Sequence, residues 1–276
     1  MKFSLIMATY GRSKEIEYFL DTLINQSYKN FELLIIDQNE DDRVARIYEN
    51  YKNKIDIKYF HNQTKGLSIN RNIGLSHISG DIVAFPDDDC LYEADTLKKV
   101  LSFFEKNTNY SFYTCNTMDK NSNESILKTK TTDVDVSVFN FLSVSISITI
   151  FVKSTAMGSF KFDEQLGLGT PFGSGEESDL LLFLLKQKNN GRYHANDYIY
   201  HPANTEIPPE KALQYGKGFG AVYKKAIVHY GFIILLPIFL LRLLKGIINI
   251  IIHKDKKVRA ASFRGRLTGF LQYSSK

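Results

Sequence analysis

The sequence predicts an α/β fold in which a mostly parallel sheet is flanked by helices. Short apolar runs typical of buried strands alternate with segments of helical apolar spacing as far as residue 115. Polar clusters directly follow three of the runs, at 8–12, 37–42 and 86–89. Because ligands in open α/β sheets bind beyond the carboxyl ends of the strands, these clusters indicate a binding site.

The apolar runs predict five strands. The first, FSLIM at 3–7, is too short for a signal peptide and is typical of a strand buried in a parallel sheet. The other predicted strands are FELLIID at 31–37, IDIKYF at 55–60, DIVAF at 81–85 and YSFYTC at 110–115.

Apolar residues at helical spacing predict a helix between each pair of strands. The first follows Ser13, a suitable N-cap residue, and buries Ile16, Phe19, Leu20, Leu23 and Ile24. The others are expected through Val44, Ile47, Tyr48 and Tyr51, over 68–78, and over 94–106.

The pattern changes after Cys115. Residues 119–135 are polar and predict a loop or hairpin, whereas the β-branched, Ser-rich segment 138–151 predicts a strand. The Gly-rich, acidic segment 166–179 predicts an irregular loop that runs into a helix, and YIYHP at 198–202 predicts a late strand that ends at a histidine.

Composition narrows the class of protein. A net charge of +5 over 276 residues is too modest to indicate nucleic-acid binding. The two cysteines, Cys90 and Cys115, have no ligand-like spacing, which favours a reducing compartment. We therefore expect a cytoplasmic catalytic or binding domain with no nucleic-acid partner.

Three consecutive acids, Asp87, Asp88 and Asp89, follow the run DIVAF. One interpretation is a solvated turn. The other is a site for Mg²⁺ or Mn²⁺, which prefer oxygen ligands. Since alternate side chains of an extended segment point the same way, Asp87 and Asp89 are expected to face one site and Asp88 another.

A second acidic cluster begins the helix predicted after residue 175. Glu176, Glu177 and Asp179 either complement the helix dipole or supply a general base. Glycines upstream would let the backbone approach a bulky ligand, and these are Gly169, Gly173 and Gly175.

Two further residues have two interpretations each. Arg71 is either a solvated helix residue or a contact to a phosphate or base. His201 either ends a strand or ligates a metal.

The segment GFIILLPIFLLRLLKGIINIII at 231–252 predicts a helix long enough to cross a bilayer. Arg242 at its midpoint opposes a span. A narrow polar stripe favours a helix that lies in the membrane surface, and it comprises Arg242, Lys245, Asn249 and His253. From Arg242 onward the sequence has nine Lys or Arg and only one acid, Asp255, which favours attraction to anionic lipid. A core helix and a true span remain alternatives.

Five segments occur along the chain in the order SLIMATYGR, FELLIIDQNEDD, GLSINRNIGL, GDIVAFPDDDC and GSGEESDLLL. Together they resemble the family 2 inverting glycosyltransferases of the GT-A fold, over about residues 3–202. The Gly-rich stretch before Asp179 and GRLTGF at 265–270 are also similar to bacterial members that build surface polysaccharides.

The resemblance implies a role for each cluster. Residues expected to bind the nucleotide are Ala8, Thr9, Tyr10, Arg12, Asp37, Gln38, Arg71 and Asp88. Gln38 replaces a frequent Asp of the family, which leaves the identity of the base open. Asp89 is the expected principal ligand of Mn²⁺ or Mg²⁺, with Asp87 and His201 as further ligands.

The same resemblance makes Glu177 the expected catalytic base. The family usually has Asp at this position, so Glu176 remains a rival. The loop expected to contact the acceptor contains Gly173, Gly175 and Asp179.

The implied activity is transfer of a sugar, with inversion, from a nucleotide-diphosphate donor, by default UDP-linked. The implied acceptor is a hydroxyl of a lipid-linked glycan or polysaccharide in cell-surface polysaccharide synthesis. A nucleotidyltransferase and a non-catalytic membrane-bound assembly subunit are the alternatives.

We expect a catalytic domain at 1–225, with a nucleotide-sugar half to about 115 and an acceptor half after it, and a basic helical region at 226–276. We also expect a cytoplasmic protein bound peripherally to the inner leaflet. Whether it forms a homodimer is open.

Overall fold

The computed structural model describes residues 1–122, 124–126, 130–144, 146–203 and 207–274. The chain folds as two compact units. The first comprises Met1–Lys65, Ile69–Lys161 and Gln187–Ala203, and the second Gly66–Ser68, Phe162–Lys186 and Asn204–Lys276. The domain boundaries expected at residues 115 and 225 stay predictions.

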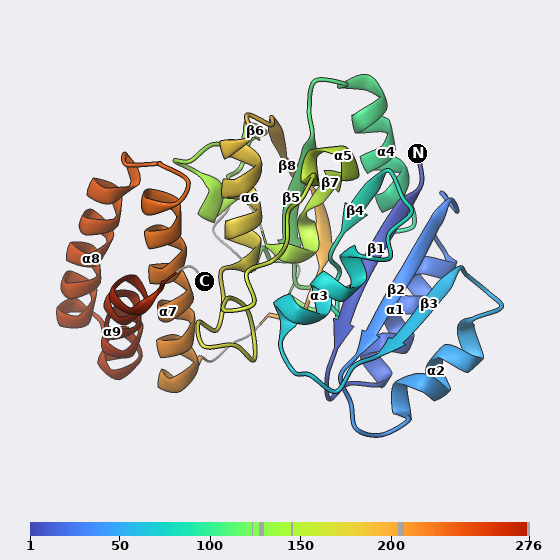
Figure 1. The fold of residues 1–276 in the computed structure, drawn as a ribbon, viewed down its shortest axis with the longest axis horizontal. Coiled ribbons are helices and arrows are strands. Elements are labelled where there is room, and N and C mark those ends of the chain that lie inside the picture. The colour runs from blue at the N-terminus through green and yellow to red at the C-terminus, as the bar shows by residue number, and fades with distance from the viewer. Residues whose placement is uncertain (123, 127–129, 145, 204–206, 275–276) are drawn as a thin grey trace. The chain divides into compact units, whose positions relative to one another are not determined.

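The first unit contains an eight-stranded sheet in the order β3-β2-β1-β4-β7-β5-β8-β6 (Figure 1). Its strands are β1 Phe3–Thr9, β2 Phe31–Asp37, β3 Ile57–His61, β4 Ile82–Ala84, β5 Phe112–Met118, β6 Val134–Asp135, β7 Phe151–Lys153 and β8 Gly191–Tyr200. Strands β1 to β4 are parallel, as are β5 and β8. Strand β7 runs antiparallel to β4 and β5, and β6 antiparallel to β8. The mostly parallel sheet predicted from the sequence is confirmed, and the antiparallel strands β6 and β7 make it a mixed sheet.

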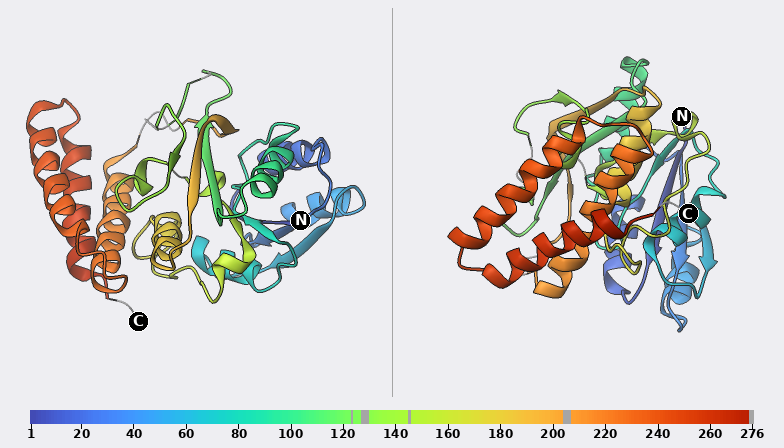
Figure 2. Two further views of the ribbon diagram at one scale, coloured as in Figure 1. Left: turned by 90° about the horizontal axis from the view of Figure 1, so that it is seen from above. Right: turned by 60° about the vertical axis from the view of Figure 1, so that its left-hand side comes forward.

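Helices cover both faces of this sheet (Figure 2). Helices α1 (Lys14–Ile24), α2 (Arg43–Tyr51) and α4 (Thr96–Lys106) bury their apolar stripes in one core with alternate residues of β1 and β2. On the other face lies α3 (Leu67–Leu75), whose Gly74 packs against side chains of β1 and β2. The strands β1 to β5 and the helices α1 to α4 were all predicted, with boundaries within a few residues.

The strand predicted at 138–151 is wrong. Two 3₁₀ turns occupy Phe141–Ser143 and Ser147–Thr149, and the strand β7 begins only at Phe151, followed by the short helix α5 (Ser154–Met157). Polar side chains bond to the local backbone, as Asn140 Oδ1 does with Ser137 N at 2.7 Å. Such bonds compete with a strand ladder, so the apolar residues are buried in irregular backbone.

Two other predictions are adjusted. Strand β8 begins at Gly191 rather than near 198, and a bulge interrupts its pairing with β5 after His194. The hairpin expected at 119–135 is represented by a bridge between Met118 and Ser125 and by the two-residue β6. Residues 123 and 127–129 of that segment lie outside the described residues.

The described residues of the second unit form the helices α6 (Glu176–Lys186), α7 (Pro209–Val228), α8 (Leu235–Ile252) and α9 (Lys256–Gln272). Helices α7 and α9 pack backbone to backbone through pairs of glycines four residues apart. A Cβ at Gly216 or Gly220 would collide with carbonyl oxygens of α9, and one at Gly265 or Gly269 with carbonyl oxygens of α7. This small-xxx-small arrangement allows the closest helix approach.

Candidate active site

The three aspartates form a tight turn directly after β4. The backbone N–H of Cys90 donates to the carbonyl of Asp87 at 3.3 Å, which closes the turn. The side chains of Asp88 and Asp89 are only 11% and 7% exposed, whereas that of Asp87 is 34% exposed. The turn is therefore not a solvated one, and its burial of charge requires compensating partners.

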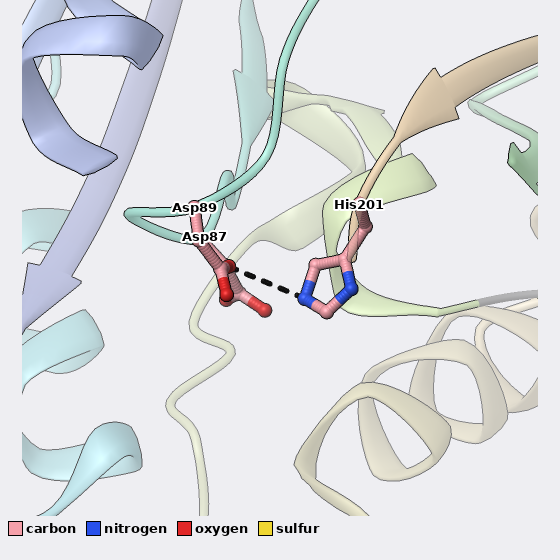
Figure 3. A group of neighbouring side chains, drawn as sticks. All are labelled: Asp87, Asp89 and His201. Carbon is pink, nitrogen blue, oxygen red and sulfur yellow. Dashed lines mark ion pairs between the residues drawn. The ribbon is translucent and has the colours of Figure 1, made fainter. Parts of the chain in front are cut away.

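Asp87 and Asp89 lie on one side of this turn together with His201, which directly follows β8 (Figure 3). One ligand atom from each residue lies within 4.8 Å of the others. His201 Nε2 is 3.2 Å from Asp89 Oδ1. Two carboxylates and one imidazole at this separation are a donor set that suits a divalent cation.

The imidazole of His201 is oriented by its other nitrogen. Nδ1 lies 2.8 Å from the carbonyl oxygen of Pro202, which accepts only, so Nδ1 carries the proton of that bond. Nε2 is consequently the nitrogen directed at Asp89. A hydrogen bond at the far ring nitrogen is the usual way in which a metal-ligating histidine is held.

Asp89 and His201 shift each other's pKa. Burial alone would raise the pKa of Asp89, but the hydrogen bond and charge of His201, with Arg12, hold it below its usual range. Burial likewise opposes the charged imidazole, yet Asp89 raises the pKa of His201. The pair thus favours positive charge beside Asp89, which a bound cation would also supply.

Asp88 faces the opposite way, into the end of β1. Its Oδ2 accepts a hydrogen bond from Thr9 Oγ1 at 2.6 Å, and Arg12 Nε is 3.1 Å from Oδ1. Burial raises the pKa of Asp88 to about 7, although Thr9 and Arg12 act against that rise. Arg12 also reaches Asp89, with Nη2 at 2.6 Å from Oδ2, so one guanidinium bridges two of the three acids.

Arg71 is buried rather than solvated. It is 1% exposed, its Nη2 lies 3.2 Å from Asp87 Oδ1, and its guanidinium lies over the ring of Phe85. The burial excludes the interpretation of Arg71 as a solvated helix residue.

The ends of β1 and β2 bring together most of the other residues expected at the nucleotide. Asp37 is fully buried and accepts hydrogen bonds from Asn39 N, Asn39 Nδ2 and Tyr59 Oη at 2.9, 2.7 and 2.7 Å. Gln38 is buried, and its backbone N–H donates a hydrogen bond to the carbonyl oxygen of Thr9. Ala8 is half-buried in β1.

Tyr10 is 54% exposed, and Lys65 Nζ lies 2.8 Å from its hydroxyl and 4.7 Å from its ring centroid. Sequence reasoning did not single out Asn39, Tyr59 or Lys65. Asn39 stood inside the polar cluster 37–42 and could have been found there. The contact of Tyr59 comes from the packing of β3 beside β2, which no local pattern reveals.

The second acidic cluster belongs to the second unit. Glu176 is buried, with its carboxylate against Gly167, whereas Glu177 is half-buried at the first turn of α6. The glycines before them approach a helix: Gly173 packs on Gln214 and Gly175, at φ +98°, on Val222, both of α7. Close packing within this unit thus accounts for both glycines.

Asp179, expected in the loop that contacts the acceptor, is 1% exposed. Its carboxylate is held by Lys225 Nζ at 2.8 Å and by the hydroxyl of Tyr230 at 2.7 Å. Lys225 also bonds to Asp163, and Tyr273 donates to the same carboxylate at 2.6 Å. Asp179 therefore ties α6 to α7, and Asp163 joins Lys225 to Tyr273 just after α9.

Comparison with known proteins identifies the class. The family model Glycosyl transferase family 2 matches residues 4–167, more than half of the chain. The chain belongs to this family, which uses nucleotide-sugar donors and inverts the configuration of the transferred sugar. The resemblance stated from the sequence motifs is therefore confirmed.

Individual relatives carry the comparison further. Over 110 residues the chain is 33% identical to poly(ribitol-phosphate) beta-N-acetylglucosaminyltransferase TarS of Staphylococcus aureus. The aligned segment covers 38% of this chain and 19% of TarS. An uncharacterized glycosyltransferase of Rickettsia felis is 33% identical over 38% of this chain and 18% of its own length. The chain thus spans less than a fifth of these two relatives. An uncharacterized glycosyltransferase of Haemophilus influenzae is 27% identical over 77% of this chain and 74% of its own length.

Solved structures show the same fold. The structure of S. aureus TarS 1–349 with UDP-GlcNAc has a TM-score of 0.65 at 19% identity, over 99% of this chain and 74% of that chain. The mannosyltransferase PcManGT from Pyrobaculum calidifontis, in complex with GDP-Man and Mn²⁺, has a TM-score of 0.70 at 12% identity, over 99% and 88%. The expected GT-A-like sheet is confirmed.

Proposed function

We propose that this protein transfers a sugar from a UDP-linked donor to a hydroxyl of a lipid-linked glycan or polysaccharide in bacterial surface-glycan synthesis. The observation that carries the proposal is the group of Asp87, Asp89 and His201 beyond the ends of β4 and β8, in a chain of this family. Ligands of open α/β sheets bind at that edge.

The cation that fits this group best is Mn²⁺. Mg²⁺ strongly prefers oxygen ligands and keeps much of its water. The two carboxylates suit Mn²⁺, and the mannosyltransferase PcManGT of the same fold was solved with Mn²⁺. Asp89 and Asp87 would hold it through oxygen, and His201 through Nε2. A cation held there stabilises negative charge on the leaving diphosphate.

The choice of uridine rests on the relatives. TarS, 33% identical over the aligned 110 residues, has been solved with UDP-GlcNAc. Asp37 and Gln38 would meet the base, Asp88 the ribose, and Arg71 with Arg12 the phosphates. Gln38 offers both a donor and an acceptor, so it can pair with a base edge.

Glu177 is the proposed base that deprotonates the attacking hydroxyl of the acceptor. Of the two glutamates at the start of α6, it is the more exposed, whereas Glu176 is buried against Gly167. Glu176 would then position the loop before α6.

A paired assay tests the proposal. Thermal unfolding is followed with UDP-, GDP- and dTDP-sugars, each with and without Mn²⁺, because a ligand of the native state raises its apparent stability. We expect a UDP-sugar to stabilise only with Mn²⁺. Glu177→Gln should keep that stabilisation and lose transfer to a glycan acceptor by about a hundredfold or more. Stabilisation by GDP-sugars alone, or normal transfer by the variant, would contradict the assignment.

A further inference from the structure

One face of α8 is apolar and exposed. Together with the two residues before the helix, it presents a continuous aliphatic surface, here called the apolar face of α8. The members, all 38–70% exposed, are Ile233, Ile234, Leu236, Leu240, Leu241, Leu244, Ile247, Ile248, Ile251 and Ile252. So large an exposed apolar patch marks an interaction surface.

The opposite face of α8 is packed within the second unit (Figure 2). Phe239 is buried and stacks on Phe270 of α9, with ring centroids 4.6 Å apart, and lies 5.1 Å from the ring of Tyr223 in α7. Leu235 is also buried. The inner face is therefore satisfied by α7 and α9, and the outer one is left to a partner.

The structure changes the polar stripe expected from the sequence. Arg242 lies with its guanidinium 5.9 Å from the ring of Phe219, and its carbonyl accepts from Arg266 Nη1 at 3.5 Å. The charge at the middle of α8 is thus directed toward α7 and α9. With about 3.6 residues per turn, Lys245 falls at the margin of the apolar face, next to Ile252.

Basic side chains border this face and the turn after it. Those that are exposed are Lys245 at the margin and Lys254, Lys256 and Lys257 at the turn and the start of α9. Asp255 is the one acid after residue 230, and it is paired with Arg259 at 2.9 Å. The border consequently attracts an anionic surface.

The composition of the face distinguishes a lipid from a protein partner. Protein interfaces are enriched in Tyr, Trp, Phe and Met, but this face consists of Leu and Ile with lysines at its edge. An aliphatic face with a basic border is typical of helices that lie in the plane of a membrane surface. Each Lys or Arg close to an anionic leaflet adds to binding.

We propose that α8 docks flat on an anionic lipid surface through its apolar face while it stays packed on α7 and α9. By length and composition α8 also suffices to cross a membrane. A span would separate Phe239 from Phe270 and carry Arg242 into the hydrocarbon. Because α9 is fixed to α7 by its glycines, a flat helix keeps contacts that a span would break.

Vesicle flotation of the full chain tests the docking. We expect binding to vesicles of phosphatidylcholine and phosphatidylglycerol in equal parts, and at least tenfold weaker binding to phosphatidylcholine alone. Leu244→Glu should weaken binding roughly tenfold or more without a change in thermal unfolding, since Leu244 is 57% exposed. Phe139→Glu, at a site 66% exposed in the first unit, is the matched control and should bind as the wild type does.

A second matched pair tests the border. Lys257→Glu should weaken binding to anionic vesicles, whereas Lys98→Glu, at an exposed site of α4, should not. High salt should mimic Lys257→Glu, because salt screens exposed charges. Equal loss in both variants would contradict a specific basic border.

Depth measurements separate a flat helix from a span. Cys90 and Cys115 are buried, so a cysteine introduced at Leu236, Leu244 or Ile251 can be labelled selectively with a fluorophore. Quenching by lipid-bound quenchers should place all three labels at one shallow depth. A label at Leu244 that lies much deeper than the labels at Leu236 and Ile251 would show a span, because the middle of a spanning helix lies at the bilayer centre. Absence of vesicle binding, or a dimer that Leu244→Glu dissociates, would overturn the proposal in favour of a protein partner.

Discussion

Asp87, Asp88 and Asp89 are consecutive, yet their surroundings give them different properties. Asp88 is buried against Thr9 and Arg12, and burial raises its pKa to about 7. Asp89 faces His201, which helps to keep its pKa low, and Asp87 reaches Arg71. Position in a turn, rather than residue type, therefore decides which acids are available to a cation.

A buried acid outside the site gives a pH-dependent prediction. Glu32 is fully buried in β2; burial alone would raise its pKa, but hydrogen bonds from Lys58, Ser4 and Ser79 lower it to about 2. A lowered folded-state pKa gives stability that is complete above the ordinary pKa near 4.5 and is lost as pH falls toward 2.

We expect Glu32→Gln to lower the free energy of unfolding at neutral pH by roughly 1–3 kcal/mol, because Lys58 loses its charged partner. Denaturant unfolding at a series of pH values measures the difference. The two proteins should converge in stability between pH 4.5 and 2. A difference that is constant over that window would contradict the assigned pKa.

At the scale of elements, the local patterns predicted the strands and helices up to β5 well. Each of those strands is a short apolar run and each helix has one apolar stripe, so local sequence and tertiary environment agree. The strand predicted at 138–151 is wrong because Ile148 and Thr149 are buried in a 3₁₀ turn, and Val144 and Ile150 are buried outside any strand. Helix α7, with six glycines or alanines on its buried face, has no apolar stripe that predicts it.

The glycine contact of α7 and α9 gives a second prediction. In an exposed helix, Gly→Ala adds up to about 1 kcal/mol of stability. At Gly220 the new Cβ would collide with the carbonyl of Arg266, so Gly220→Ala should destabilise instead. Gly246→Ala is the control, since its nearest neighbour is a side-chain atom of Phe263 at 3.2 Å. Thermal unfolding should rank the control above Gly220→Ala; equal midpoints would count against the close contact.

The buried ion pair of Lys225 and Asp179 gives a third stability prediction. Lys225→Met leaves Asp179 buried without its cation, which typically costs about 3–5 kcal/mol. Asp179→Asn combined with Lys225→Met removes the uncompensated charge and should recover part of that loss. Chemical denaturation of the three proteins measures the coupling. Strictly additive effects would show that the pair does not act together.

At the scale of the whole molecule, the family motifs carried the functional prediction and the structure supplied their surroundings. The acidic turn, Arg71 and the ends of β1 and β2 were found from motifs in order along the sequence. The partners Asn39 and Tyr59 were not, because they depend on how neighbouring strands align. His201 was a candidate ligand from its place at the end of a predicted strand. Its approach to Asp89 could not be predicted locally, because β7 and β5 lie between β4 and β8 in the sheet.

The proposed function depends most on the group of Asp87, Asp89 and His201. Titration of Mn²⁺ into the protein, followed by the electron paramagnetic resonance of free Mn²⁺, measures binding without turnover. The wild type with UDP should remove one equivalent of Mn²⁺ from solution. Asp89→Asn should weaken that binding at least about tenfold, or roughly 1.4 kcal/mol. Equal Mn²⁺ affinity in the wild type and in Asp89→Asn would contradict the assignment of the metal site.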